Sequence, residues 1–328
     1  MTALLQGRAR GIVAIVAIAL LLVLLARALP DTFLTAANLL NVSRQVSMLA
    51  VVAFAMTIVM ATGDFDLSVG SMASLSGVTA AALFTQGHSI PVAIAAALGT
   101  GLLGGLLNGL MVGYAGILPF VATLGTLTIF SGTAFVFSDG KTIFGRAIPE
   151  AFGGFARGGP PLDALGLDGS RLPSLTLVAL AVLALVWYLL ERRAFGRHLY
   201  VIGSNVEAAR LAGIPVRRLR ATAFVLSGLG AAAAGLMLVS RVASANPIQG
   251  AGLMLDAIAC VFLGMTLHRE GEPHVLGTLA GVALLGLMDN ALTQVGIDAY
   301  VREILVGTLL VAAVGLARLR RSGTTAGH

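Results

Sequence analysis

Long apolar runs recur along the whole chain and constrain its fold more than any other feature. Each of them approaches or reaches the roughly 20 residues that an α-helix needs to cross a bilayer. There are ten, at residues 11–29, 46–62, 67–85, 90–112, 118–138, 172–190, 219–240, 253–267, 273–292 and 300–317. Polar and apolar residues do not alternate at every second position within them, which excludes a membrane β-barrel. We therefore expect an all-α polytopic membrane protein with about ten transmembrane helices.

The composition supports this expectation. Hydrophobic residues make up 57% of the 328 residues and charged residues only 11%, whereas about a quarter of an average soluble domain is charged. The single cysteine, Cys260, lies in an apolar run, so an intrachain disulfide is excluded and a buried filling role is expected. The net charge of +6 comes from arginines at the ends of the runs, which indicates membrane topology rather than nucleic-acid binding.

Arginine-rich blocks predict the orientation. They lie at residues 8–10, 192–220 and 318–321, separated by six runs and then by four, so all three fall on one side of the membrane. With Arg269 included, that side carries thirteen of the 21 basic residues. The richer side is cytoplasmic by the positive-inside rule. Both termini are then cytoplasmic, and residues 139–171 form the longest periplasmic loop.

The first run has a second interpretation. Arg8 and Arg10, followed by an apolar stretch and by Ala26-Arg27-Ala28, resemble a cleavable signal peptide. The arginine beside the possible cleavage site and the length of the apolar stretch both favour a retained membrane anchor.

The chain carries an internal repeat. Residues 116–121 match residues 296–301, and Leu-Gly-Thr occurs at both 98–100 and 276–278, with offsets of 178 to 180 between the matched glycines. By parity, the spans that carry the two Leu-Gly-Thr segments run in opposite directions. Inverted repeats in transporters place the substrate path at the repeat interface. Chance similarity between helices rich in Gly, Leu and Thr is the alternative.

Two carboxylates, Asp64 and Asp66, interrupt the apolar sequence at Gly-Asp-Phe-Asp-Leu-Ser-Val-Gly, residues 63–70. A charge at the centre of a spanning helix is costly, so such groups face a cavity, pair with another charge or lie at an interface. Three placements follow: a cytoplasmic turn in which Gly63 ends one helix and an aspartate caps the next, a broken helix that lines a translocation path, or an aspartyl protease dyad with Asp256 or Asp289. The protease motif fits the sequence poorly.

Other polar residues lie in or near the apolar runs. Each is explained either by a helix–helix hydrogen bond or by contact with a polyhydroxylated ligand, because amides and carboxylates exchange several hydrogen bonds with hydroxyl groups. The substrate path that we predict comprises Asp64, Asp66, Ser68, Asn108, Asn246 and Asn290. His268 and His274 belong to a short polar turn, and no metal site or catalytic residue is expected.

Residues 191–218 form the longest cytoplasmic segment between spans. Ser204-Asn205-Val206-Glu207 matches a capping box, and Gly213 followed by Ile214 and Pro215 terminates a helix. The pattern predicts one isolated helix of about eight residues. Because a helix this short is marginal in water, it must contact the membrane surface, the rest of the chain or a groove in a partner protein.

Glu207-Ala208-Ala209 followed by Gly213 resembles the EAA loop of ABC importer permeases. The resemblance extends over residues 30–315, where the chain is similar to the ribose-type monosaccharide permeases. Its further motifs are residues 38–41 (Asn-Leu-Leu-Asn), 63–70, 119–126 (Pro-Phe-Val-Ala-Thr-Leu-Gly-Thr), 196–197 (Gly-Arg), 246–247 (Asn-Pro) and 255–259 (Leu-Asp-Ala-Ile-Ala). The chain departs from these permeases at residues 268–274, where they usually carry a Gly-Gly-x-Gly turn. This departure puts in doubt how closely the contacts of this chain with its ATPase match those of ribose systems.

The resemblance implies a single transmembrane permease domain over residues 1–328 in the bacterial inner membrane. Residues 191–218 would be its coupling segment, with Ser204, Glu207, Ala208, Ala209 and Gly213 at the ATPase contact. The implied partners are an ATPase with two nucleotide-binding domains, a periplasmic sugar-binding protein, a second permease copy or paralogue, and membrane lipid. No cofactor is expected on this chain. It contains no Gly-x-x-x-x-Gly-Lys-Ser/Thr motif, so ATP hydrolysis would belong to the partner.

An ion-coupled secondary transporter remains the alternative. In that case Asp64 or Asp66 would carry a proton or a sodium ion, and inverted repeats would suit it equally well.

Overall fold

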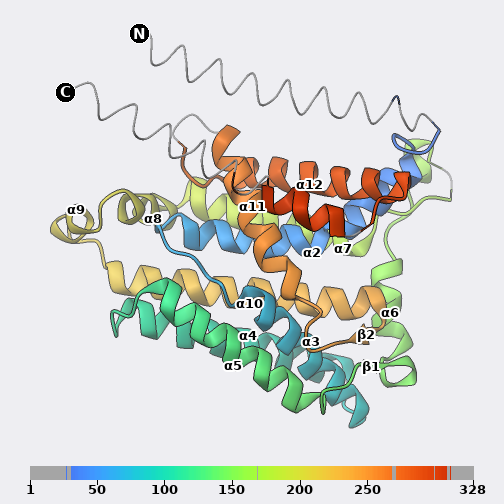
Figure 1. The fold of residues 1–328 in the computed structure, drawn as a ribbon, viewed down its shortest axis with the longest axis horizontal. Helices are drawn as coiled ribbons and strands as arrows, with labels where there is room; N and C mark the ends of the chain where they lie inside the picture. Colours follow the sequence, from blue (N-terminus) through green and yellow to red (C-terminus); the bar gives the residue numbers. More distant parts are fainter. Residues whose placement is uncertain are drawn as a thin grey trace.

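The computed structural model describes residues 27, 31–167, 169–267, 271–298, 300–308 and 311. The fold is helical (Figure 1). The helices are α2 (Ala36–Met60), α3 (Val69–Thr85), α4 (Ile90–Gly113), α5 (Pro119–Phe137), α6 (Glu150–Arg157), α7 (Ser174–Trp187), α8 (Ala194–Ser204), α9 (Val206–Leu211), α10 (Val216–Val242), α11 (Ala251–Leu267) and α12 (Val275–Val295). A π-helical turn, Tyr188–Arg192, extends α7, and residues 300–308 form a further helix. Two short strands, β1 (Ile143–Phe144) and β2 (Ser244–Ala245), pair antiparallel.

Six of the described helices are long and apolar enough to cross a membrane: α2, α4, α5, α7 with its π-helical turn, α10 and α12. Helices α3 and α11 are also apolar but have only 17 residues each. The expected run at 11–29 and the second half of the run at 300–317 fall almost entirely outside the described residues. The chain is therefore an all-α polytopic membrane protein; six of its described helices qualify as spans by length and composition, and the expected number of about ten is not confirmed.

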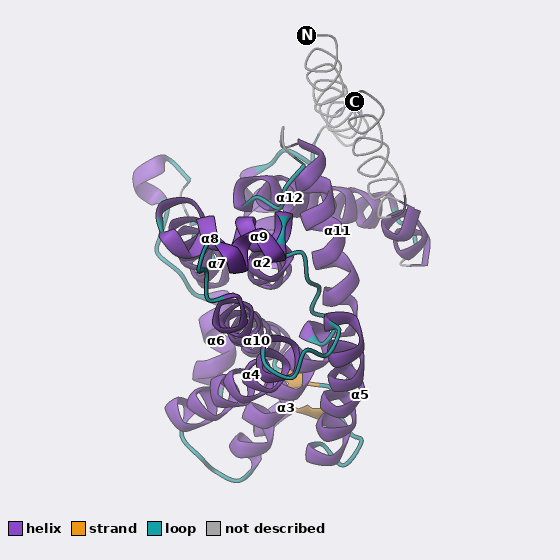
Figure 2. Ribbon diagram, turned by 90° about the vertical axis from the view of Figure 1, so that its left-hand side faces the viewer, coloured by secondary structure: helices purple, strands orange, loops and turns teal. Residues whose placement is uncertain are grey.

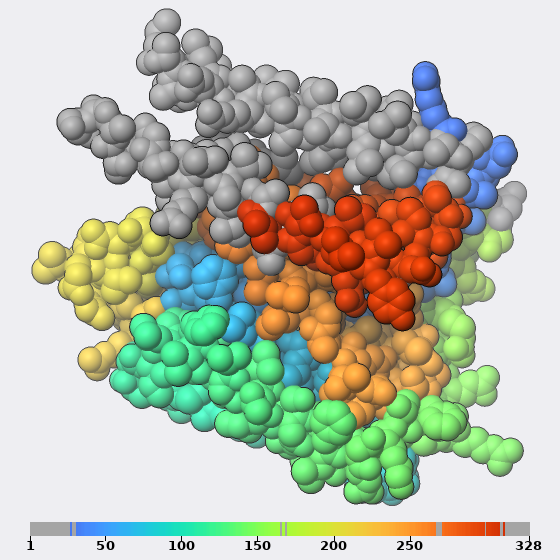
Figure 3. Space-filling model, viewed as in Figure 1, coloured from blue at the N-terminus to red at the C-terminus, as the bar shows by residue number. Residues whose placement is uncertain are grey.

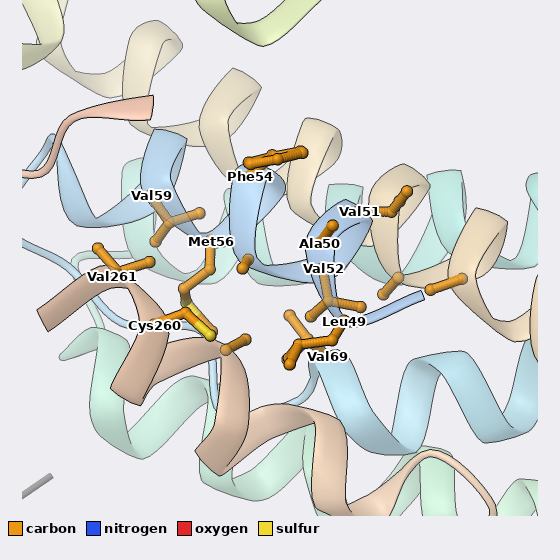
Figure 4. Packing of buried hydrophobic residues seen from close by; sticks show 14 of the residues in the cluster. Leu49, Ala50, Val51, Val52, Phe54, Met56, Val59, Val69, Cys260 and Val261 are labelled. Carbon is orange, nitrogen blue, oxygen red and sulfur yellow. The ribbon is translucent and has the colours of Figure 1, made fainter. Parts of the chain in front are cut away.

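Helix α10 lies in the middle of the molecule, with α3 and α4 on one side and α2 on the other (Figures 1 and 2). Helix α2 packs in turn against α7, α11 and α12. Met56 of α2 and Cys260 of α11, both fully buried, meet in this core (Figure 4). Cys260 thus fills the apolar interior, as predicted. On the face seen in Figure 3, α11 (orange) separates α5 (green) from residues 275–308 (red).

The contacts between helices fix their directions. Thr57 bonds to Thr278 and Asn38 bonds to Asn290, so α2 and α12 are antiparallel. Helix α2 is also antiparallel to α10, because Ala55 lies against Gly230 while Asp64, beyond the end of α2, reaches back to Arg220. Helix α4 is antiparallel to α10 as well, as its glycine contacts show. It follows that α4 and α12 run in opposite directions, as the parity of the spans predicted.

Close packing of α4 on α10 depends on glycine at every fourth position. A methyl group at Gly105 would lie 2.6 Å from the carbonyl oxygen of Phe224, and one at Gly109 would lie 2.7 Å from that of Ala221. Such small residues let helix backbones approach each other in a membrane, where van der Waals contact drives association. The full set is Gly101, Gly105, Gly109 and Gly113.

Two connectors of equal length join long helices to short ones. The first connector, residues 61–68, links α2 to α3, and the second connector, residues 243–250, links α10 to α11. In the first, the Asp66 carboxylate accepts a hydrogen bond from the backbone N–H two residues later, at 3.0 Å. In the second, the Asn246 side chain does the same at 2.9 Å. The two Asx-turns are 180 residues apart.

The two connectors bring the short helices together inside the molecule. A methyl group at Gly70, in the first turn of α3, would lie 2.7 Å from the carbonyl oxygen of Gly250, directly before α11. Figure 1 shows the first connector leaving the end of α2 beside α8 and running inward to α3. Two shorter helices, of 17 residues each, therefore begin side by side in the interior.

The segments expected outside the spans contain more structure than the sequence suggested. Residues 139–171 hold β1, α6 and two 3₁₀ turns rather than a plain loop, and α6 packs on α10. Residues 191–218 hold the predicted short helix as α9, but α8 precedes it and packs against it, so the prediction that it is the one isolated helix of the segment is wrong.

Candidate functional site

Asp64 is paired rather than exposed to a path. It is only 4% exposed. The Arg220 guanidinium of α10 donates through Nε to one carboxylate oxygen at 2.7 Å and through a terminal nitrogen to the other. The Thr62 hydroxyl donates to the same carboxylate at 2.9 Å. This bidentate geometry is the strong form of a charge-assisted pair, so it fixes the beginning of the first connector to α10.

The side-chain partners of Asp66 in the described part of the chain are hydroxyl groups rather than a cation. Its first oxygen accepts from the hydroxyl of Ser68 at 2.6 Å as well as from the Ser68 N–H. Its second oxygen accepts from the hydroxyl of Ser227 on α10 at 2.8 Å. Three donors satisfy a buried carboxylate that would otherwise be costly in an apolar interior.

The hydrogen-bond network continues from Ser68 through two more helices. The Asn108 amide of α4 donates to the Ser68 hydroxyl at 2.9 Å, and the Thr126 hydroxyl of α5 donates to the Asn108 carbonyl at 2.8 Å. All members are at most 2% exposed. We call this set, Asp66, Ser68, Asn108, Thr126 and Ser227, the Asp66 network. It ties four elements together inside the protein.

The depth of Asp66 distinguishes the expected placements. Its partner Ser227 lies seven residues beyond Arg220 on α10, which is about 10 Å along the helix axis. Ser227 is also near the middle of this 27-residue helix. The first connector therefore runs from one end of α10 toward its centre, which is the broken-helix arrangement. Gly63 does take a positive φ of 81° after α2, but Ser68, not an aspartate, is the N-cap residue of α3.

The two remaining path residues lie outside the Asp66 network. Asn246 belongs to the second connector and donates to the Thr142 hydroxyl at 2.8 Å, next to the β1–β2 pair. Asn290 exchanges two hydrogen bonds with Asn38 of α2, at 2.9 and 3.0 Å. The structure thus brings together three of the six predicted path residues and pairs Asp64 with an arginine.

Sequence reasoning missed three partners in this region. Arg220 was counted only as a topology charge, and Ser227 and Thr126 are small polar residues without a distinguishing pattern. The correspondence between the Asx-turns of Asp66 and Asn246 could have been found in the sequence, because the two residues are 180 positions apart, an offset that the repeat also shows.

The coupling segment exposes four of the five residues that the sequence assigned to a partner, namely Ser204, Glu207, Ala208 and Gly213. Asn205, rather than Ser204, caps α9 by accepting from the backbone N–H groups of Glu207 and Ala208, so the capping-box prediction is wrong in its residue. Ser204 is the last residue of α8. The Glu207 side chain is 72% exposed and pairs only with Arg210 among its described contacts. Ala208 is exposed as well.

The inner face of α9 is held by one small apolar cluster. Ala209 is fully buried against Ile202 of α8 and Val216 of α10. Gly213 follows with a φ of 75°, the left-handed conformation that ends the helix. The predicted contact of this short helix with the rest of the chain is therefore present, and its other face remains open.

Helix α8 contacts both the first connector and the segment before α12. A methyl group at Gly203 would lie 2.4 Å from the carbonyl oxygen of Ala61, at the start of the first connector. The Tyr200 hydroxyl donates to the carbonyl oxygen of Pro273, before α12, at 2.9 Å. Burial raises the pKa of Tyr200 well above its ordinary value, and the charges of Glu191 and Glu272 raise this pKa further.

His274, in the short polar turn predicted from the sequence, has a structural role. His274 is the N-cap of α12, and its Nε2 lies 3.2 Å from the Glu191 carboxylate. His268 and the rest of the departure at residues 268–270 lie outside the described residues.

A family of membrane transport proteins, described as the permease component of a branched-chain amino acid transport system, matches residues 38–314. The chain belongs to this family.

The permease is 37% identical over 298 residues to the ribose import permease protein of Bacillus subtilis (strain 168), covering 91% of this chain and 90% of that protein. It is 36% identical over 290 residues to the L-arabinose transport system permease protein of Escherichia coli (strain K12), covering 88% and 85%. It is 30% identical over 293 residues to the D-allose transport system permease protein of the same strain, covering 88% and 86%. No solved structure matches the permease.

Proposed function

We propose that the permease is the transmembrane subunit of an ABC importer that carries a monosaccharide across the bacterial inner membrane. The relatives that match nearly the whole chain support a sugar as the substrate, since their names specify ribose, L-arabinose and D-allose. The observation that carries the mechanism is the open face of α9, where Glu207 and Ala208 are exposed on a short helix anchored by Ala209.

This face suits a separate ATPase with two nucleotide-binding domains, which would hydrolyse ATP while this chain binds no cofactor. A periplasmic sugar-binding protein would deliver the substrate, and a second permease copy or paralogue would complete the path. By the positive-inside rule, the arginines around α8 and α9 favour the cytoplasmic side for these helices. Both termini then lie in the cytoplasm, and the terminal runs together with α3 and α11 raise the spans to about ten.

The two connectors support an inverted repeat. In this arrangement α2 to α5 correspond to α10, α11, α12 and the helix at 300–308, with an offset of about 180 residues at the Asx-turns. Because α8 contacts the connector of one half and the turn before α12 of the other, a movement of α9 driven by ATP would tilt both halves around the interior. The predicted path residues Asp64, Asp66, Ser68, Asn108, Asn246 and Asn290 would respond to that movement.

The contacts of the aspartates argue against an ion-coupled carrier. Arg220 neutralises Asp64, and three donors hold Asp66, so neither carboxylate is free for a transported cation in this conformation. The family description suggests branched-chain amino acids as a second candidate substrate.

Reconstitution tests the proposal. The permease would be purified with the ATPase and binding protein encoded beside its gene, and uptake of labelled D-ribose, L-arabinose, D-allose and L-leucine would be measured in proteoliposomes. We expect uptake of one of the sugars that requires ATP and the binding protein. ATP-independent uptake driven by a proton or sodium gradient would support the ion-coupled carrier. Transport of L-leucine alone would overturn the sugar assignment.

A further inference from the structure

A cavity of about 260 Å³ lies between α2, α10, α11, α12 and the helix at 300–308, apart from the Asp66 network; most of its lining is apolar, with a group of polar side chains on one part of it. Gln45 in the N-terminal half of α2 and Arg241 near the end of α10 both line it. The opposite ends of these two helices meet α8 and α9, since α2 ends beside Gly203 and α10 begins after α9. The cavity is therefore at the end of the molecule away from the coupling segment.

The floor of the cavity is a cluster of charged side chains on three helices. Arg302 donates to the Asp256 carboxylate at 2.8 Å, and its Nε lies 2.7 Å from the Asp289 carboxylate. Gln45 donates to the second oxygen of Asp289 at 2.6 Å. These carboxylates are 15% and 19% exposed. Because one guanidinium lies between two carboxylates, the cluster offers hydrogen-bonding groups rather than a carboxylate free to bind an ammonium group.

Several polar groups of the lining retain hydrogen-bonding capacity. A carboxylate has about four lone-pair sites, whereas Asp256 accepts one described hydrogen bond. The Arg241 guanidinium makes no hydrogen bond or ion pair within the described part of the chain. Gln249 uses only its carbonyl, as acceptor for the Asn246 N–H, so its amide protons stay available. Leu238, Leu253 and Leu285 supply the apolar walls.

We propose that this cavity binds one monosaccharide on its way through the permease, an inference that rests on the proposed function. Pockets for drug-sized ligands have about 300–1,000 Å³, so a cavity of about 260 Å³ is sized for a smaller ligand. Carboxylate, guanidinium and amide groups pair with adjacent hydroxyls, while the leucines cover the C–H faces. No aromatic residue lines it within the described chain, which keeps binding weak, as release toward the cytoplasm requires.

Gly252 is a position where a reporter cysteine can be placed in the cavity without a clash. It lines the cavity, and a methyl group built on it would meet nothing within 4 Å. Leu255, three residues later on α11, is 51% exposed and is absent from the lining, so it serves as the matched control. The one native cysteine, Cys260, is fully buried, so an added cysteine would be the reactive one.

The experiment uses Gly252→Cys and Leu255→Cys permeases in the complete complex in proteoliposomes. Each is treated with N-ethylmaleimide in the presence and absence of D-ribose, L-arabinose, D-allose or L-leucine. We expect the transported sugar to slow labelling of Gly252→Cys at least threefold and to leave Leu255→Cys unchanged. After labelling, uptake by Gly252→Cys should fall at least tenfold while ATP hydrolysis stays within twofold, because the block lies away from the coupling segment.

Each outcome separates this inference from the proposed function. Equal labelling rates with and without the transported sugar, together with normal uptake after labelling, would overturn the cavity as a substrate site while ATP-driven sugar import stands. Loss of ATP hydrolysis along with uptake would also overturn it, because the modification would then act on conformational change. Protection by L-leucine alone would overturn a sugar as the ligand. A wild-type complex that transports none of the sugars would instead refute the proposed function.

Discussion

Arg220 and Asp64 are joined by a bidentate ion pair across 156 residues of sequence. The pair fixes the first connector to α10 at the end of the molecule that carries the coupling segment. Asp64 is almost completely buried, so the arginine supplies the charge compensation that a carboxylate in this position requires.

Breaking this pair should destabilise the permease. Removing one partner of a buried ion pair typically costs about 3–5 kcal/mol; since Arg220 keeps a side-chain exposure of 21%, we expect about 2–3 kcal/mol for Asp64→Ala. The double variant Asp64→Ala with Arg220→Leu should lose less than the sum of the single changes. Thermal unfolding in detergent would measure this, with the exposed Glu207→Ala as control. Strict additivity would show that the pair contributes no coupling energy.

Replacing Asp66 should impair transport more than replacing Asp64. In Asp66→Asn, one of the two oxygens becomes an NH₂ donor, so the side chain cannot accept from Ser68 and Ser227 as the carboxylate does. We expect uptake by membrane vesicles at matched expression to fall severalfold for Asp66→Asn and less for Asp64→Asn. Full activity in both variants would show that the Asp66 network is not needed for transport.

Charge reversal at Glu207 should uncouple transport from ATP hydrolysis with little effect on folding. The side chain is 72% exposed, and a mismatched charge at a protein interface costs several kcal/mol. In proteoliposomes, Glu207→Lys should lower uptake and substrate-stimulated hydrolysis together, while basal hydrolysis by the isolated ATPase is unaffected. Arg210→Ala is the control, because it removes the same pair within α9 without reversing the charge of Glu207. Normal coupling in Glu207→Lys would rule out α9 as the docking helix.

A side chain at Gly203 should disturb the contact between α8 and the first connector. The added methyl group of Gly203→Ala would meet the Ala61 carbonyl at 2.4 Å, and such overpacking costs about 1–3 kcal/mol. We expect a lower melting temperature and weaker substrate-stimulated ATP hydrolysis. The matched variant Gly125→Ala, where nothing lies within 4 Å, should change neither. Identical behaviour of the two variants would mean that α8 does not transmit movement through this contact.

Tyr200 should make stability fall at alkaline pH. Its pKa is raised in the folded protein by burial and by two nearby carboxylates, so the neutral phenol is the form that folding favours. This contribution is complete below the unfolded pKa of about 10 and is lost as pH rises toward the folded pKa. Melting temperatures of wild type and Tyr200→Phe, followed from pH 8 to 11, should show a smaller alkaline loss in the variant. Parallel curves would contradict this assignment.

The sequence by itself determined the class of the protein. Runs of about 20 apolar residues cross a membrane as helices, because the hydrocarbon region offers no hydrogen-bond partner for free backbone N–H and C=O groups. Gly63 and Gly213 take a positive φ just after α2 and α9, and Pro215 directly precedes α10, and these signals can be read without a tertiary structure. The parity of the spans that carry the two Leu-Gly-Thr segments also predicted the opposite directions of α4 and α12.

Only the tertiary structure decided what the polar residues contact. Asp64 and Asp66 are two positions apart, yet one pairs with Arg220 and the other with Ser227, because α10 presents these residues at different depths beside the first connector. The cavity likewise joins Gln45, Asp256 and Arg302 from distant parts of the chain. Partners so far apart in sequence leave no local pattern, since their proximity depends on how the helices pack against one another. The sequence thus specifies the long apolar helices, and packing among the helices specifies the charge pairs, the Asp66 network and the cavity.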